Sequence, residues 1–242
     1  MKMQLQALFL GIVAIIATVA PVSGQTFGTA EALTAAEQVP WAAIGQITYG
    51  IGQAAPGGAI CTGTLVAADL VLTAGHCVSV DGVAMPAGDV QFNAGWRAGG
   101  SLATRRGRAI ILAGPTDKQP RDLSQDVALL VLETPIDAQD IRPLPLSARG
   151  LISEIYTLIG YRRDTPDSIY RDEGCTLLQT QPALLMLGCA VVSGNSGAPI
   201  LLEQSGVWQV AAVMVAAQRG GGAVQSYAVI PGDDLRVRIA AP

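Results

Sequence analysis

The chain has 242 residues, of which 50% are hydrophobic and only 14% charged, and its formal net charge is −4. This length suffices for one sizeable hydrophobic core or two smaller ones. A protein that binds nucleic acid presents a basic face to the phosphates, so the acidic balance excludes nucleic acid as an expected partner.

The N-terminal stretch has the pattern of an export signal. Lys2 gives a positive start, an apolar run follows from Ala7 to Ala20, and small residues stand at Ser23 and Gly24. The run is shorter than the roughly 20 residues that a membrane span needs, so we predict a signal peptide over residues 1–24. An uncleaved anchor is the alternative. Export predicts a secreted or periplasmic protein without membrane attachment once the signal is removed.

Beyond this segment, short apolar runs are separated by Gly, Pro, Asn and Asp. The runs predict strands at Ile44–Tyr49, Ala59–Val66, Leu70–Thr73, Val90–Trp96, Arg108–Leu112, Val127–Leu132, Ile155–Gly160, Ala183–Leu187, Pro199–Glu203, Trp208–Val215 and Val224–Ile230. The proline-rich stretch Thr134–Gly150 reads as a connection between two halves, and residues 231–240 predict one short helix. Many short strands between turns predict an all-β sandwich or barrel architecture.

Cysteines in an exported chain predict disulfides. The four cysteines are Cys61, Cys77, Cys175 and Cys189, and they allow three pairings. The pairs Cys61–Cys77 and Cys175–Cys189 are favoured because each closes a short loop, which stabilises the fold by about 3 kcal/mol. A zinc site is the competing interpretation, but the chain has no CxxC pair and only 1 histidine. We therefore expect no metal.

Two polar residues stand at the ends of apolar strands. His76 follows one such strand and a glycine, and a disulfide at the adjacent Cys77 would fix the backbone around its ring. A lone histidine is more often structural or solvated than catalytic. Asp126 comes directly before another apolar strand, where a carboxylate is costly to desolvate unless it is paired. A cap at the start of the strand is the alternative role for this aspartate.

The stretch VVSGNSGAPI, residues 191–200, places a serine between glycines. A serine hydroxyl becomes a nucleophile only when a neighbouring base takes its proton. Acyl transfer also needs N–H donors aimed at the developing oxyanion. Gly194 can adopt the backbone conformation that turns its N–H inward, and the N–H of Ser196 can supply a second donor. Taken alone the pattern is weak, because many Gly-Ser turns look alike.

The three segments CTGTLVAADLVLTAGHC, SQDVALLVL and SGNSGAPIL together are specific, since they follow in the order His, Asp, Ser. Their order and their setting beside apolar strands resemble the chymotrypsin (trypsin-like) serine endopeptidase family. The resemblance extends from Val39 to Ile230. The segment PWAAIG, and Cys189 seven residues before Ser196, are most similar to the bacterial secreted branch that includes glutamyl endopeptidases.

This resemblance implies an all-β fold of two six-stranded antiparallel β-barrels with the active site in the cleft between them. Residues 25–140 would form the N-terminal barrel, carrying His76 and Asp126. Residues 141–242 would form the C-terminal barrel, carrying Ser196.

The resemblance also implies the roles of these residues. His76 would act as general base and then general acid, Asp126 would orient its ring, and Ser196 would attack the scissile carbonyl. The N–H groups of Gly194 and Ser196 would form the oxyanion hole. The substrates would be proteins or peptides, with no cofactor, and we expect a monomer.

Two positions depart from the family pattern. Animal trypsins carry an aspartate before the nucleophile, and it binds the N-terminal ammonium that zymogen cleavage creates. This chain has Asn195 there and no activation junction like Arg-Ile-Val-Gly-Gly, so we hypothesise that amide hydrogen bonds hold the oxyanion loop. Val215 stands where many members carry a serine that binds the triad aspartate. Asp126 is therefore expected to rely on backbone N–H groups near His76.

The specificity pocket is less clearly encoded. Ala190 occupies the position at its base, so the acidic base of trypsin is absent. Glutamyl endopeptidases use a histidine on the strand that corresponds to VAAVMVAAQ, and this chain has none there. The pocket is predicted to have an apolar wall formed by Met214, Val215, Ala216 and Ala217. Such a wall predicts a preference for small or medium apolar residues before the scissile bond. Arg219 could instead meet an acidic side chain, although a solvated arginine is the simpler interpretation.

Two other classes of protein remain as alternatives. One is a catalytically idle binding protein on the same fold, which the intact set of His76, Asp126 and Ser196 argues against. The other is an unrelated exported β-sandwich adhesin, in which the three motifs would be scattered in space.

Overall fold

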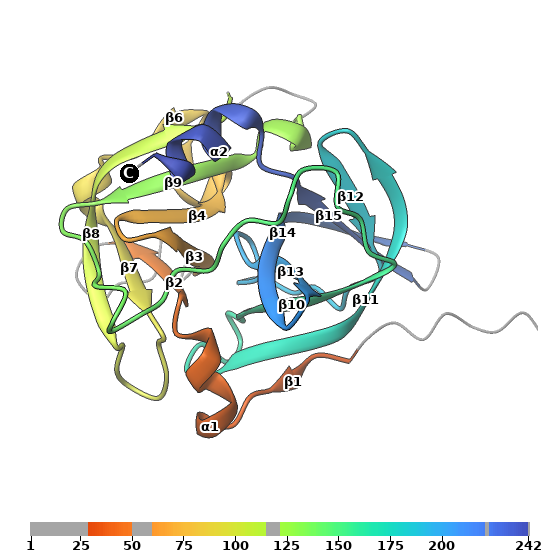
Figure 1. Cartoon of the computed structure of the whole chain (residues 1–242), viewed down its shortest axis with the longest axis horizontal. Helices are drawn as coiled ribbons and strands as arrows, with labels where there is room; N and C mark the ends of the chain where they lie inside the picture. The colour runs from red at the N-terminus through yellow and green to blue at the C-terminus, as the bar shows by residue number, and fades with distance from the viewer. Residues whose placement is uncertain (1–28, 50–59, 115–121, 221–222, 242) are drawn as a thin grey trace, which may run out of the picture.

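The computed structural model describes residues 29–49, 60–114, 122–220 and 223–241 (Figure 1). The predicted signal peptide, residues 1–24, lies outside them. Among the described ranges, no helix is long and apolar enough to cross a membrane.

The first barrel is a closed sheet of six antiparallel strands in the order β2-β3-β4-β9-β8-β7. Its strands are β2 (Ile44–Tyr49), β3 (Cys61–Ala67), β4 (Leu70–Ala74), β7 (Val90–Ala94), β8 (Ala103–Leu112) and β9 (Val127–Leu132). The most apolar strand, β9, is buried over its whole length. Register shifts in the β3–β4 and β8–β9 pairs supply bends of the kind that help a sheet to close on itself.

The second barrel also closes, because β11 pairs with both β10 and β12. Its strands are β10 (Ile155–Tyr161), β11 (Ile169–Gln181), β12 (Leu184–Leu187), β13 (Pro199–Gln204), β14 (Val207–Gly220) and β15 (Ala223–Val229). The two barrels lie side by side in Figure 1, the first on the left. They confirm the predicted fold class of two six-stranded antiparallel β-barrels.

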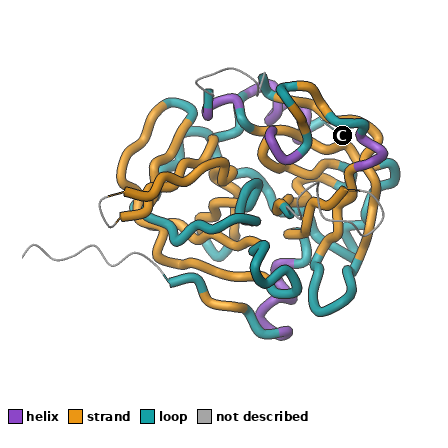
Figure 2. Tube along the Cα trace, turned by 180° about the vertical axis from the view of Figure 1, so that it is seen from behind, coloured by secondary structure: helices purple, strands orange, loops and turns teal. Residues whose placement is uncertain are grey.

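The remaining elements are short. They are β1 (Glu31–Ala32), α1 (Ala35–Gln38), η1 (Val39–Trp41), η2 (Gly75–Cys77), β5 (Ser79–Val80), β6 (Val83–Ala84), η3 (Ala87–Asp89), η4 (Leu123–Gln125) and α2 (Asp233–Ala240). Helix α2 is the short C-terminal helix that the sequence predicted. Seen from behind, the trace consists almost entirely of strands and loops, with brief helical turns between them (Figure 2).

One long strand was not predicted. Strand β11 carries a polar sequence, IYRDEGCTLLQTQ, and only Ile169, Asp172 and Cys175 in it are buried. These three positions do not follow the strict alternation of a half-buried strand, so no period-two signal marks it. The predicted strands Ile44–Tyr49 and Val127–Leu132 have the bounds that the structure gives to β2 and β9.

Each end of the described chain crosses to the other barrel. Strand β1 pairs with β11 of the second barrel. Helix α2 contacts β3 of the first barrel, and its Leu235 is buried in a hydrophobic cluster to which strands of both barrels contribute. The Arg236 guanidinium donates from Nη1 to the carbonyl of Ser147 over 2.8 Å. The predicted division of the chain near residue 140 did not include these crossings.

Candidate active site

Two neighbouring strands of the first barrel bring His76 and Asp126 together. Strands β4 and β9 are antiparallel, with Ala74 opposite Val127, so the last residue of β4 and the first residue of β9 lie at the same end of the barrel. The turn η2 follows β4 and carries His76, and the turn η4 ends directly before Asp126. The register of the two strands thus brings His76 and Asp126 next to each other.

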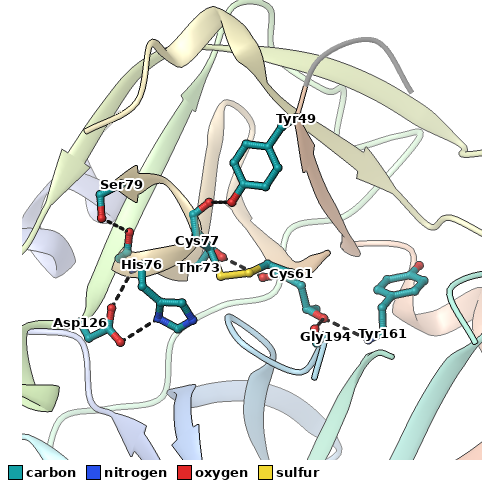
Figure 3. Close-up of a disulfide and its surroundings, with 11 residues drawn as sticks. Tyr49, Cys61, Thr73, His76, Cys77, Ser79, Asp126, Tyr161 and Gly194 are labelled. Carbon is teal, nitrogen blue, oxygen red and sulfur yellow. Dashed lines mark hydrogen bonds and ion pairs between the residues drawn. A yellow bond between two sulfur atoms is a disulfide. The ribbon is translucent and has the colours of Figure 1, made fainter. Parts of the chain in front are cut away.

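The Asp126 carboxylate is fully buried and binds His76 twice. Its Oδ1 accepts from the backbone N–H of His76 over 2.8 Å, and its Oδ2 lies 2.9 Å from Nδ1 of the ring. Since a carboxylate only accepts, Nδ1 carries a proton, and in the neutral form of the ring Nε2 then keeps its lone pair. Figure 3 shows Nε2 on the side of the ring away from Asp126. The backbone N–H of His76 supplies the support that the sequence predicted for Asp126.

Ser196 lies in the loop between β12 and β13. It lines a pocket of about 380 Å³ whose walls also include His76 and Gly194. The second barrel therefore delivers the serine to the same pocket as the imidazole of the first barrel. A β-sandwich that scatters the three motifs is inconsistent with this arrangement.

The side chain of Asn195 holds the loop before the serine. It is 2% exposed. Its Oδ1 accepts from the N–H of Val192 over 2.9 Å, and its Nδ2 donates to the carbonyl of Tyr161 over 2.9 Å. One partner is a donor and the other an acceptor, a combination that an amide satisfies and a carboxylate does not.

The peptide unit between Ser193 and Gly194 has a defined direction. The carbonyl of Ser193 accepts from the N–H of Arg163 over 2.8 Å. In a trans peptide the C=O and N–H point to opposite sides, so the N–H of Gly194 points away from Arg163. Gly194 has a φ of +104°, and a Cβ there would lie 2.7 Å from the Arg163 nitrogen. Only glycine fits this turn without strain.

Thr62 of β3 fastens this loop to the first barrel. Its N–H donates to the carbonyl of Ser196 over 2.8 Å. Its Oγ1 donates to the carbonyl of Gly194 over 2.9 Å and accepts from the N–H of Tyr161 over 3.0 Å. One buried threonine thus binds the residues on both sides of Asn195. Sequence reasoning did not single it out, because nothing in its own segment marks it.

We expect Thr62→Val to lower the free energy of unfolding by about 1–3 kcal/mol, because a buried carbonyl and a buried N–H lose their shared hydroxyl. Thr64→Val on the same strand is the matched control, since the described residues offer its buried Oγ1 no hydrogen-bond partner. Denaturant unfolding measures both variants. Equal stability of the two would contradict the role given to the Thr62 hydroxyl.

A second, smaller pocket adjoins Ser196 on the second barrel. Its volume is about 190 Å³, and its lining consists of Val191, Val192, Ser193, Ser196, Met214, Ala216 and Ala217. Met214, Ala216 and Ala217 were predicted as wall residues, and Val191 and Val192 were not. Ala190 and Val215 are not among its lining residues.

Ala190 instead donates its backbone N–H to a buried aspartate. Asp172 of β11 is 0% exposed. Its Oδ2 accepts from the N–H of Ala190 over 2.7 Å and its Oδ1 from the N–H of Gly174 over 2.9 Å. Sequence analysis gave no role to Asp172, since it predicted no strand around it.

Both short-range cysteine pairs are present as disulfides, Cys61–Cys77 and Cys175–Cys189. The first lies directly beside His76 (Figure 3). The sulfurs of Cys61 and Cys77 and a ring nitrogen of His76 lie within 4.8 Å of one another. A disulfide sulfur has no thiolate to give a metal, so this cluster does not suit zinc.

Comparison with known proteins gives a consistent picture. Residues 61–213 match the family model described as a trypsin-like peptidase domain. Among solved structures, the protease Anisep from Arthrobacter nicotinovorans has a TM-score of 0.67 at 20% identity, over 88% of this chain and 100% of that one. A Glu endopeptidase in complex with MPD has a TM-score of 0.67 at 19% identity, over 88% and 94%.

A thermostable serine protease, AL20, from an extremophilic microorganism has a TM-score of 0.63 at 19% identity, over 82% of this chain and 95% of that one. These likenesses show a shared fold. No curated protein sequence is significantly similar to the chain.

Proposed function

Because the chain belongs to the trypsin-like peptidase family, we propose that it is a secreted serine endopeptidase with His76, Asp126 and Ser196 as its triad. The observation that carries this proposal is that Asp126 forms two hydrogen bonds with His76, which lines the same pocket as Ser196. Its substrates are proteins or peptides.

The geometry of the pair supports a defined sequence of proton transfers. Nε2 of His76 takes the proton of the Ser196 hydroxyl as the oxygen attacks the scissile carbonyl. The imidazolium then gives that proton to the leaving amine, and the acyl group stays on Ser196. Water attacks the acyl-enzyme while His76 again takes a proton, which returns to Ser196 when the acid leaves.

The oxyanion hole is assigned to the N–H groups of Gly194 and Ser196. The Ser193 carbonyl is bound by Arg163 on one side, which turns the N–H of Gly194 to the other. Donors that are fixed before the reaction stabilise the oxyanion without reorganising at the moment of attack.

We also propose that no ion-pair switch activates the enzyme, since Asn195 already binds Val192 and Tyr161. A protein that begins at Gln25 should be as active as one with a few residues more or fewer. An inert Gln25 form that gains activity on trimming to an internal residue would show that a new terminus is needed.

The residue before the scissile bond is assigned to the small pocket beside Ser196. Its volume of about 190 Å³ suits small or medium side chains, and the valine, methionine and alanine residues that line it together with Ser193 are the basis for proposing an apolar preference. Cleavage of a peptide library measures this preference. A strong preference for Glu, or for Lys and Arg, would contradict it.

Export accords with the disulfides, which persist in oxidising compartments. The signal peptide, the site of cleavage after Gly24 and a monomeric state are parts of the same proposal.

A fluorophosphonate probe tests the function directly, since it labels only an activated serine. We expect stoichiometric labelling that Ser196→Ala abolishes and that Ser101→Ala, a control on the first barrel, leaves unchanged. Absence of labelling in well-folded protein would favour the idle binding protein.

A further inference from the structure

Two pockets flank Ser196, and they differ in size and chemistry. The pocket that includes His76 has a volume of about 380 Å³, and the pocket lined by Val191 and Met214 one of about 190 Å³. The smaller pocket is the one assigned above to the residue before the scissile bond, so the larger pocket still needs an occupant.

The proton path decides which part of the substrate enters the larger pocket. The imidazolium of His76 must reach the leaving amine, so the segment released with that amine passes beside His76. The smaller pocket contacts Ser196 without His76 among its lining residues, which suits the acyl side. We call the larger space the leaving-group pocket.

Most walls of the leaving-group pocket are apolar. They include Tyr49, Ile60, Val80 and Met85. Val80 is 61% exposed, so its side chain is open to solvent in the part of the chain that the structure describes. The Tyr49 hydroxyl donates to the carbonyl of Cys77, and burial raises the pKa of Tyr49 to about 12, so this wall stays uncharged at neutral pH.

One cationic residue, Arg163, is among the described residues that line the same pocket. Arg163 lies in the loop after β10, and its N–H holds the Ser193 carbonyl over 2.8 Å, which fixes its backbone beside the oxyanion loop. Its side chain is exposed, and within the described residues no ion pair involves it. The neighbouring Arg162 is engaged differently, since it pairs with Asp164 over 3.4 Å and lies 4.6 Å from the ring centre of Tyr170.

We infer that this enzyme selects substrates on the leaving side, by an apolar side chain and a carboxylate within the first two residues after the scissile bond. The apolar side chain packs against Ile60, Val80 and Met85, and the carboxylate binds the guanidinium of Arg163. The carboxylate is either an acidic side chain or the chain terminus of a leaving dipeptide. This inference rests on the proposed function, because it requires an acyl-enzyme at Ser196.

Trapping of the acyl-enzyme measures the leaving side alone. An alanine or valine ester forms the acyl-enzyme, and added dipeptide amines compete with water for it. By microscopic reversibility the attacking amine occupies the place of the leaving group. We compare the amides Leu-Glu, Glu-Leu, Leu-Gln and Ser-Gln, and the free acid Leu-Gln, which separates a terminal carboxylate from an acidic side chain.

Whichever of Leu-Glu amide and Glu-Leu amide reacts better should trap about threefold more acyl-enzyme than Leu-Gln amide does. The factor is small because an exposed ion pair contributes modestly to binding, and it should fall as salt is added. We expect Leu-Gln amide to trap several-fold more than Ser-Gln amide, by burial of the leucine. Arg163→Gln should abolish the acid preference, because it keeps the backbone N–H but removes the charge. Arg108→Gln, which changes net charge on β8 outside the pocket, should leave all ratios unchanged.

Two results would overturn the inference: equal trapping of acidic and amide nucleophiles, or an acid preference that survives in Arg163→Gln. In both cases, hydrolysis of the ester would still support the proposed function. A folded protein that neither hydrolyses the ester nor reacts with the probe would overturn both.

Discussion

Asp126→Asn is expected to lower kcat by about 10⁴-fold with the fold intact, the order of magnitude that the wrong histidine tautomer costs in a Ser-His-Asp enzyme. The backbone N–H of His76 lies 2.8 Å from Oδ1 and can only donate. It therefore holds the amide oxygen of the variant, and the amide NH₂ faces Nδ1. The ring must then accept at Nδ1 and carry its proton on Nε2, where it cannot take the proton of Ser196.

Steady-state kinetics on an ester substrate measures this loss, with circular dichroism as the check on folding. Asp69→Asn is the matched control, because within the described residues the ion pair of its carboxylate is an exposed one with Arg108 at 3.8 Å. A kcat within tenfold of the parent enzyme in Asp126→Asn would show that the pair does not set the tautomer during catalysis.

Asn195→Asp is expected to lower the free energy of unfolding by about 3 kcal/mol at neutral pH. The amide donates to the Tyr161 carbonyl over 2.9 Å, and a carboxylate at the same place would set two acceptors against each other in a buried site. The bond from Val192 survives, since it needs only an acceptor. The damage is thus confined to one contact of the loop that carries Ser196.

The loss should depend on pH in one direction. Burial and the facing carbonyl raise the pKa of the new carboxyl above its unfolded value of about 4. A raised folded pKa means that the native state holds the proton more tightly than the unfolded chain, so stability relative to the parent falls as pH rises. The penalty is smallest below pH 4, where the acid form can donate to Tyr161, and it is complete above the folded pKa.

Urea unfolding of the parent and the variant at several pH values tests this dependence. Asn93→Asp is the matched control, because Asn93 is also buried but its Nδ2 donates to the hydroxyl of Thr48 over 3.0 Å. A hydroxyl can reverse its role and donate to a carboxylate, so this variant should lose less with rising pH. A pH-independent loss in Asn195→Asp would contradict the opposed-acceptor explanation.

Some of the strands that the sequence predicted have a simple burial pattern. Val127–Leu132 is apolar throughout and wholly buried, so its bounds could be recognised from composition alone. Strand β11 could not be recognised in this way, because charged residues interrupt its three buried positions. Its pairing with β10 and β12 comes from the closure of the barrel, which no local window contains.

The same division holds for the active site. His76, Asp126 and Ser196 could be proposed as a triad because their three segments together follow in the order His, Asp, Ser. Thr62 could not, since its hydroxyl joins positions 132 and 99 residues away in the chain. Arg163 escaped notice for the same reason, because only the fold brings it to the wall that His76 lines.

Because each end of the described chain contacts the other barrel, the order in which the chain is synthesised affects when each barrel can complete its folding. The ribosome delivers all strands of the first barrel early, but Leu235 of α2, which is buried with them, emerges only after β15. The hydrophobic cluster that first-barrel residues share with the second barrel therefore stays incomplete until residues 233–240 have been made. A nascent fragment carries His76 and Asp126 on an incomplete core, so we expect these two residues to reach their final setting only after the segment that carries Ser196 has also been made.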